Sequence, residues 1–458
     1  MNNDNQMTHI ERRAIWGLST IFFLRMLGMF MVLPVITTYG IKLKGANEYL
    51  IGLAIGIYGF TQAVFQIPFG LLSDRIGRKP LIIIGLILFV IGSIIAAVKN
   101  SIWGIIIGRA LQGCGAISCV IMALLSDLVR EQNRTKAMSF IGVSFGITFF
   151  IAMIIGPIIT DKYGLQTLFW IIAILSSCAI LIILFLVPHT SNHILNRECG
   201  IVTNSISKVL KNKKLLKLNI NIFYLHILLI STFVTLPSQL EKNGFPATLH
   251  WKIYLLTMLI AFITAMPFII YSETKRCIKK VLISCIGIMI ISQTLFWISE
   301  LHVNIILIAI ELFFFSFNVI EAILPSLISK ESPVGYKGTA MGIYSTSQFL
   351  GAAIGGSIGG WIYEHFDTYT VFLFNSLIAI PWFFISLSMK EPPYVSSLRI
   401  TLSNSMLVAI TNLQNYLTTQ PGVKTVLIIP EEKSAYVKID NTLTNRAILE
   451  EKLSNFCV

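Results

Sequence analysis

The sequence has few charged residues for its length. Asp, Glu, Lys and Arg make up 12% of the 458 residues, whereas soluble proteins carry about a quarter. Hydrophobic residues make up 55%, and the mean hydropathy is +0.77. A folded soluble chain still exposes much of its surface to water, so its core cannot bury that much apolar area. The composition therefore excludes a soluble globular protein and predicts that a lipid bilayer is the solvent.

Cysteine pairs and enzyme motifs are also missing. The seven cysteines lie mostly inside apolar runs and none forms a C-x-x-C pair, so neither a disulfide framework nor a zinc site is expected. The sequence contains no G-x-x-x-x-G-K-[ST] nucleotide loop and no hydrolytic constellation. These absences predict a protein that is not an enzyme and needs no metal or organic cofactor. The net charge of +13 does not indicate nucleic-acid binding, because the basic residues do not cluster on one polar segment.

Apolar runs of membrane-spanning length fill most of the chain. A spanning helix needs roughly 20 apolar residues to cross the hydrocarbon layer. The first run begins near Ala14 and no small-residue cleavage site follows it, so we expect a retained span rather than a signal peptide. The twelve predicted spans are 14–39, 50–72, 80–98, 102–127, 136–160, 167–187, 217–240, 250–271, 281–299, 303–329, 338–363 and 370–389.

Lys and Arg in the short loops predict the orientation of the spans. If the N-terminus lies in the cytoplasm, the cytoplasmic segments carry 20 of these residues and the opposite loops carry 6. Basic residues accumulate on the cytoplasmic side of membrane proteins. Both termini are therefore expected in the cytoplasm of a multi-pass protein of the bacterial inner membrane.

The chain is expected to divide into two related bundles and a terminal domain. Ala137-Met138 opens a glycine-bearing span that reaches Gly156-Pro157, and Ala340-Met341 opens another one that reaches Gly359-Gly360. Parallel repeats of six spans are typical of one large transporter architecture. The predicted domains are a six-helix bundle over 1–190, a linker over 191–216, a second six-helix bundle over 217–390 and a soluble domain over 391–458.

The segment from 391 onward is polar and lacks apolar runs of membrane-spanning length. Short β-type runs at Leu398–Leu402, Val423–Ile429 and Ala435–Ile439 alternate with helical patterns at Met406–Leu417 and Asn445–Phe456. This β-α-β-β-α order predicts a small ferredoxin-like α+β domain. No cysteine pair stands in its first loop, so metal binding is not expected there.

The loop after the second span carries the most specific motif. It places two glycines, an acidic residue and three basic residues around a tight turn, which suits a positive cytoplasmic face. An ordinary basic turn is the alternative. The residues are Gly70, Asp74, Arg75, Gly77, Arg78 and Lys79.

This loop resembles the signature G-x-L-x-D-R-x-G-R-K of the major facilitator superfamily at every defining position. The resemblance extends to the strings Leu24–Pro34, Ile67–Pro80, Gly338–Gly342 and Ser434–Asp440, and it favours drug-efflux members that carry a C-terminal YAM domain. It implies an all-α membrane fold of two six-helix bundles, alternating access and proton-driven export. It also implies that Asp127 and Gly338 join the loop in a conformational switch.

Ionisable residues inside the spans mark the expected transport pathway. They are Arg25, Arg109, His226, Glu311 and Glu321. Charge inside a membrane is costly unless it faces water or a partner, and by resemblance the spans concerned (one, four, seven and ten) line a central cavity. We expect Glu321 to couple transport to protons, with Arg25 as a candidate partner; a purely structural role beside an arginine is the alternative. Arg109 is open to a bracing role, and His226 to a hydrogen-bonded core role.

Glycines in the spans predict close helix contacts. Gly113 follows Arg109 in a pattern that resembles the superfamily's R-x-x-x-G motif, whereas Gly146, Gly156 and Pro157 resemble its antiporter motif imperfectly. Small residues let helices approach closely in lipid, so packing alone also explains them.

Together these features predict a monomeric secondary transporter that exchanges a small molecule for protons. Proton-coupled uptake of a metabolite such as a sugar, and a transporter-like sensor that reports through its C-terminal domain, remain alternatives.

Overall fold

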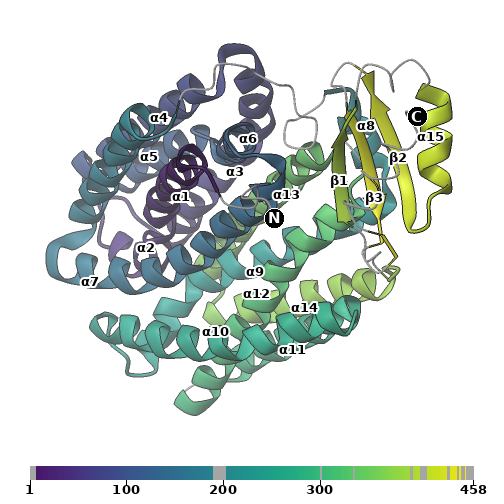
Figure 1. The fold of residues 1–458 in the computed structure, drawn as a ribbon. Helices are drawn as coiled ribbons and strands as arrows, with labels where there is room; N and C mark the ends of the chain where they lie inside the picture. Colours follow the sequence, from purple (N-terminus) through teal and green to yellow (C-terminus); the bar gives the residue numbers. More distant parts are fainter. Residues whose placement is uncertain are drawn as a thin grey trace.

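The computed structural model describes residues 7–188, 203–299, 302–333, 336–391, 396–402, 410–430, 434–440, 443–444 and 449. The chain is mostly helical, with one small sheet near its C-terminus. Its helices gather into two groups, α1 to α7 and α9 to α14, and the sheet lies beside one end of the second group (Figure 1).

The first bundle is built from helices up to residue 185. They are α1 (His9–Phe30), α2 (Leu33–Gly40), α3 (Glu48–Ile76), α4 (Arg78–Val98), α5 (Ile102–Cys114), α6 (Ser118–Leu128) and α7 (Glu131–Phe185).

The second bundle follows a short linker helix, α8 (Thr203–Lys211). Its helices are α9 (Lys213–Lys242), α10 (His250–Thr274), α11 (Ile278–Ile298), α12 (Val303–Glu331), α13 (Lys337–His365) and α14 (Thr368–Leu387).

The structure is consistent with twelve spans. Ten helical segments of the described part are long and apolar enough to cross a membrane. One of them, α7, contains a reversal at Gly164, where φ is 85°; this left-handed backbone suits a residue without a side chain. α7 therefore provides two spans. The glycine-rich α13 has 29 residues, enough to cross a bilayer, and it packs against α3 and α9.

Two predicted spans are broken helices. Span one divides into α1 and α2 around Met31, and Pro34 stands in the first turn of α2. Span four divides into α5 and α6 at residues 115–117. At this second break a side chain on Gly115 would lie 2.3 Å from the Gly85 carbonyl oxygen. Close backbone contact thus explains the glycine, and the break frees backbone groups for side-chain partners.

The bundles have two distinct ends. The basic end carries the loops around residues 75–79, 128–131, 275–280 and 332–337, and the opposite end carries those around residues 41–47, 99–101, 243–249 and 366–367. α1 begins at the basic end, where Glu11 pairs with Arg130, and the C-terminal sheet contacts the same end through the hydrogen bond from Lys438 to Lys330.

The C-terminal sheet contains β1 (Ser396–Thr401), β2 (Val423–Ile429) and β3 (Ser434–Ile439), in the order β1-β3-β2. Both pairings with the central β3 are antiparallel, and α15 (Ile410–Thr419) connects β1 to β2. This is the split β-α-β arrangement expected for a ferredoxin-like domain. The predicted last helix falls largely outside the described residues.

The central strand β3 is buried on both of its faces. Alternate residues of β3 pack with Leu413 and Leu417 of α15 in a core of their own. On the other face Tyr436 and Lys438 are buried too. The Lys438 ammonium donates a 2.6 Å hydrogen bond to the carbonyl of Lys330, in the last turn of α12. The domain is therefore seated on the basic end of the second bundle.

Candidate functional site

A membrane-embedded polar cluster joins three helices of the second bundle. His226 lies on α9, Glu321 on α12 and Gln348 on α13. The side-chain amide nitrogen of Gln348 lies 2.9 Å from Nε2 of His226 and 3.1 Å from Oε1 of Glu321. One amide group thus bridges two of the ionisable residues that were predicted to mark the transport pathway. The bridging glutamine was not among the predicted site residues, because the predicted pathway residues were all ionisable and the span that became α13 supplied none of them.

The neighbours of the cluster fix its hydrogen-bond pattern. Nδ1 of His226 lies 3.3 Å from the carbonyl oxygen of Ile222, one turn earlier on α9. The ring of Phe317 stands 6.0 Å from the imidazole. The second carboxyl oxygen of Glu321 is buried and has no hydrogen-bond partner within the described part of the chain. An unsatisfied buried oxygen costs free energy. Binding a proton or a hydrogen-bond donor at this oxygen would therefore stabilise the site.

Arg25 is held inside the first bundle by neutral groups. Its guanidinium donates to Oε1 of Gln62 at 2.9 Å, to the carbonyl of Gly115 at 2.7 Å and to the hydroxyl of Ser118 at 3.1 Å. The last two partners flank the break between α5 and α6. The structure therefore does not bring Arg25 and Glu321 together in this conformation, and their state-dependent pairing stays a prediction.

Arg109 is also buried, at 1% exposure. It donates to Gln112 at 3.0 Å, and its guanidinium lies 4.4 Å from the ring centroid of Tyr58. A guanidinium over an aromatic face gains a cation–π interaction that offsets part of its desolvation. Arg109 therefore links α5 to α3, which fits the bracing alternative as well as a role in a pathway.

Glu311 stands apart from these clusters. It is half-buried on α12, ten residues before Glu321 and thus about 15 Å away along the helix. Within the described residues it makes no ion pair or hydrogen bond. The two glutamates of this span therefore occupy different environments, as expected from their spacing.

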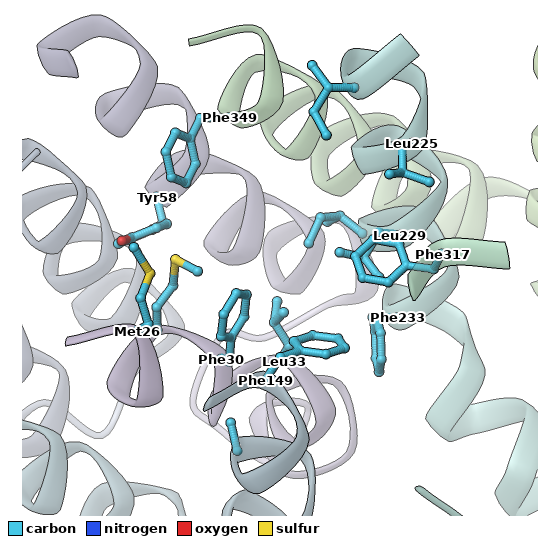
Figure 2. Close-up of a cluster of buried hydrophobic side chains, with 14 of the residues drawn as sticks. Met26, Phe30, Leu33, Tyr58, Phe149, Leu225, Leu229, Phe233, Phe317 and Phe349 are labelled. Carbon is cyan, nitrogen blue, oxygen red and sulfur yellow. The ribbon is translucent and has the colours of Figure 1, made fainter. Parts of the chain in front are cut away.

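Apolar side chains from both bundles meet between Arg109 and the polar cluster. Phe30 packs edge-on against Phe149 at 4.9 Å, Phe149 lies 5.7 Å from Phe317, and Tyr58 lies 6.4 Å from Phe349. Figure 2 shows these rings, with Met26, Leu33 and Leu229, converging at the boundary between the bundles. These aromatic and sulfur-containing side chains are buried and belong to one continuous apolar core.

The opposite end is closed by a seam of glycines between α3 and α13. A side chain on Gly52 would lie 2.4 Å from the Gly356 carbonyl oxygen, and one on Gly56 would lie 2.6 Å from the Ala353 carbonyl oxygen. At the rim, the Glu364 carboxylate accepts hydrogen bonds from the backbone N–H groups of Glu48 at 3.0 Å and of Tyr49 at 3.4 Å. The last turn of α13 thus caps the first turn of α3.

The motif loop at the basic end forms a chain of charges. Arg78 makes an ion pair with Asp74 at 3.4 Å and another one with Asp127. Gly77 ends α3 with φ at 102°, a conformation that favours glycine. The Lys79 ammonium donates to the carbonyl of Val187, just past α7, where a cation complements the end of a helix. The structure thus brings Asp74, Arg78 and Asp127 together.

Three other predicted members of this motif show no such contacts with the described residues. Arg75 is exposed on the last turn of α3, and Gly70 is buried one turn earlier, where its carbonyl accepts the Ser73 hydroxyl. Gly338 lies in the first turn of α13. Its role in a switch stays a prediction.

Of the glycines predicted to make close helix contacts, Gly113 and Gly156 do so. A side chain on Gly113 would lie 2.0 Å from the Thr61 hydroxyl and 2.5 Å from the Tyr58 carbonyl. Gly156, followed by Pro157 within α7, packs against the Met31 carbonyl at the break of span one.

Gly146 was predicted to belong to the same contacts, and the prediction was wrong for this conformation. Open space surrounds the position that its side chain would occupy. The neighbouring Phe145 is the residue that faces α1, and its ring packs against Phe22 and Phe30 at 6.3 and 5.3 Å. At this level α7 contacts α1 through the ring of Phe145, and Gly146 takes no part in the contact.

Glu11 is a buried carboxylate that the sequence analysis missed. It is 2% exposed at the start of α1. It accepts the N–H of Thr8 in a capping box, and it accepts the backbone N–H, Nε and Nη2 of Arg130 at 2.8, 2.9 and 3.1 Å. The capping-box spacing Thr8-x-x-Glu11 was the available signal. This residue fastens α1 to the beginning of α7.

Replacing Glu11 by alanine should destabilise the protein without touching the polar cluster. Charge-assisted hydrogen bonds contribute about 1.5–3 kcal/mol each, so we expect a loss of at least about 2 kcal/mol in the free energy of unfolding. Thermal unfolding of the purified protein in detergent measures the change. Arg12→Ala, at an exposed neighbouring position, is the control and should have no comparable effect. Equal stability of both variants would disprove the fastening role.

Comparisons with known proteins agree with the architecture. A family model described as Major Facilitator Superfamily matches residues 18–356 and 319–412, and one described as YajR YAM domain matches residues 398–455. Inner membrane transport protein YajR of Escherichia coli K12 is 61% identical over 451 residues, which cover 98% of this chain and 99% of YajR.

More distant relatives share the membrane part. Multidrug resistance protein MdtH of Yersinia enterocolitica is 23% identical and aligns over 78% of this chain and 87% of its own length. The crystal structure of the nucleoside transporter NupG superposes with a TM-score of 0.65 at 18% identity, over 83% of this chain and 99% of NupG. At that identity the likeness concerns the fold alone.

Proposed function

The chain belongs to the major facilitator superfamily of membrane transporters, and from that membership we propose that it exports amphipathic small molecules in exchange for protons. The observation that carries this proposal is the His226–Gln348–Glu321 cluster. It places a carboxyl group and an imidazole, linked by hydrogen bonds, inside the membrane-spanning part of a transporter. Ionisable residues at such depth typically mark ion or proton pathways.

The substrate class follows from the boundary between the bundles. Phenylalanine, tyrosine and methionine side chains dominate the surface beside the polar cluster. Such side chains bind aromatic or aliphatic molecules through apolar contact. The Glu321 carboxylate beside them favours molecules that carry a positive charge. The printed name of the relative MdtH, a multidrug resistance protein, supports the same class.

Alternating access would use the two ends in turn. The distribution of Lys and Arg supports a cytoplasmic basic end with both termini on that side. We propose that the protein works as a monomer. Closure of the opposite end by the glycine seam then corresponds to an inward-facing state that takes substrate from the cytoplasm. No cofactor enters this scheme, because the proton gradient supplies the energy.

Transport by the full chain in proteoliposomes tests the proposal. We expect ethidium or a similar fluorescent cation to move against its gradient when a pH gradient is imposed, and to stop when an uncoupler collapses that gradient. Movement of a panel of such cations only down their own gradients would contradict proton coupling. Movement in the same direction as protons would instead indicate the uptake alternative, with a metabolite such as a sugar as cargo.

One contact favours a regulatory role for the C-terminal domain. Lys438 holds the end of α12, the helix that carries Glu321. A domain bound to this helix restrains its movement. The sensor alternative assumes the same link between the domain and α12. A sensor would bind the same cations and show no proton-driven flux.

A chain that ends after Pro393 should still reach the membrane as a folded monomer, but with altered transport activity. The second core, in the C-terminal domain, is separate from the core of the bundles, so the bundles lose little packing when it is removed. Size-exclusion chromatography and transport assays of the truncated chain check this expectation. Lys438→Ala should reproduce the altered activity without truncation. Degradation of the truncated chain under mild expression would make the domain structural instead.

A further inference from the structure

Two cations meet at the carboxyl end of α7, on the basic end of the first bundle. The Arg13 guanidinium of α1 donates a 2.7 Å hydrogen bond to the carbonyl of Phe185, and the Lys79 ammonium of α4 donates to the carbonyl of Val187. The two cations are close enough to interact electrostatically. The C-terminus of a helix carries only about half a negative charge, so it balances a small part of the two positive charges.

No ion pair joins Arg13 or Lys79 to a carboxylate within the described residues. The acidic groups nearest in the fold are engaged by other cations, in the pairs Glu11–Arg130, Asp74–Arg78 and Asp127–Arg78. Arg13 is exposed and Lys79 is half-buried. Both side chains carry several N–H bonds, so they can also donate to an anion from outside the protein.

Large apolar side chains lie beside Arg13 on the outer face of the bundle. Trp16 follows Arg13 by one turn of α1 and is 62% exposed. Its ring packs edge-on against that of Phe140 on α7, at 5.1 Å. Phe185, whose carbonyl accepts from Arg13, is 76% exposed. Aromatic side chains at the ends of membrane spans are typical of the lipid–water interface, so this surface faces lipid.

The combination of charge and apolar surface fits an anionic phospholipid. Its phosphate accepts charge-assisted hydrogen bonds from guanidinium and ammonium groups, and its acyl chains contact the exposed apolar side chains. A zwitterionic phospholipid carries a positive charge next to its phosphate, which weakens the attraction to two cations. Basic pockets between membrane-spanning helices on the cytoplasmic side typically bind anionic head groups.

We infer that Arg13 and Lys79 form a binding site for one anionic phospholipid of the cytoplasmic leaflet, with its phosphate between the two cations and an acyl chain along Trp16 and Phe140. The bound lipid ties α1 and α4 to the end of α7. The assignment to the cytoplasmic leaflet rests on the orientation proposed above. The binding itself does not depend on what the protein transports or in which direction.

The second bundle provides an internal comparison. Its first and last spans, α9 and α14, correspond in the repeat to span one and span six. Lys217 near the start of α9 donates a 2.7 Å hydrogen bond to the carbonyl of Ser388, at the end of α14. Within the described residues no second cation is hydrogen-bonded to that helix end. Lys217 therefore occupies a position like that of Arg13 without the excess of charge.

Native mass spectrometry of the purified full chain in detergent tests the site, because it resolves each bound lipid. The probes are dioleoyl phosphatidylglycerol and dioleoyl phosphatidylcholine, which share their acyl chains and differ in net charge. A basic residue at the membrane surface strengthens the binding of an anionic lipid about fivefold. The first phosphatidylglycerol should therefore bind roughly 30-fold more tightly than the first phosphatidylcholine. Arg13→Gln and Lys79→Gln should each reduce this preference by about fivefold.

Matched variants separate this site from general surface charge. Lys217→Gln removes the corresponding cation of the second bundle and should leave the preference unchanged. Trp16→Ala should weaken the binding of both lipids alike, because it removes contact with the acyl chain and no charge. Arg13 is exposed, so Arg13→Gln should fold even if Lys79→Gln does not. Arg13→Lys keeps the charge and should retain most of the preference.

Three outcomes would overturn the inference. The first is equal binding of the two lipids by the parent protein. The second is a preference that survives Arg13→Gln, or that falls equally in Lys217→Gln. The third is displacement of phosphatidylglycerol by inorganic phosphate at a similar concentration, which would assign the two cations to a soluble anion instead of a lipid.

Discussion

Glu321→Gln should abolish proton-driven export while leaving substrate binding in place. Each unit of pH difference stores about 1.4 kcal/mol per proton, which supports a concentration ratio of about tenfold when one proton is exchanged for one substrate. A side chain that cannot release a proton cannot draw on that gradient. The ratio of external to internal substrate should therefore fall from about tenfold per pH unit to one.

The structure indicates that this substitution removes the titratable group and preserves its surroundings. Glutamine has nearly the shape of glutamate, and its amide oxygen can still accept the 3.1 Å hydrogen bond from Gln348. Folding and the apolar boundary between the bundles should persist, so fluorescence binding of the same cation should persist as well.

Glu311→Gln is the matched control for this experiment. Glu311 lies on the same helix and has no hydrogen bond to the cluster within the described residues, so the Glu311→Gln variant should retain concentrative export. Export by Glu321→Gln at the parent level would eliminate Glu321 as the coupling site.

Asp74→Asn should shift the protein toward the conformation that is open at the basic end. In the alternate state, by family resemblance, Asp74 approaches the first turn of α13 near Gly338, where unpaired N–H groups carry about half a positive charge. An aspartate there contributes up to ~2 kcal/mol, or roughly 30-fold in a two-state equilibrium. In the present structure Asp74 is held instead by Arg78, which also binds Asp127.

Cysteine labelling from each side of the membrane measures this shift. A reporter cysteine in the apolar cluster should become more accessible from the basic end in Asp74→Asn and less accessible from the opposite end. Labelling that matches the parent would leave Asp74 as a solvated loop residue that only balances Arg75 and Lys79.

Glu364→Gln offers a comparison in the opposite direction. Its carboxylate caps the N-terminus of α3 when the opposite end is closed, so losing the charge should favour the alternate state. The two substitutions combined should return labelling toward the parent pattern. Shifts in the same direction would show that neither carboxylate acts by stabilising one closed end.

The polar cluster shows where prediction from the sequence stopped. His226 and Glu321 were identified because a charged or titratable residue in an apolar span is rare and costly. Gln348 belongs to a polar stretch, Tyr344-Ser-Thr-Ser-Gln348, with no such cost to mark it, and it lies 122 residues from His226. Only the packing of α9, α12 and α13 brings the three side chains together.

The sequence by itself determined that the protein spans a membrane, how many spans it has, and that a ferredoxin-like domain follows them. These properties depend on local quantities: the thickness of the bilayer sets the length of each apolar run, and backbone geometry sets the period of each strand and helix. The breaks in spans one and four, the partners of Arg25, the open space at Gly146 and the bridge at Gln348 were decided by tertiary structure. Each of them depends on which backbone or side-chain atoms of distant segments come within hydrogen-bond or van der Waals distance, and no local pattern encodes such distances.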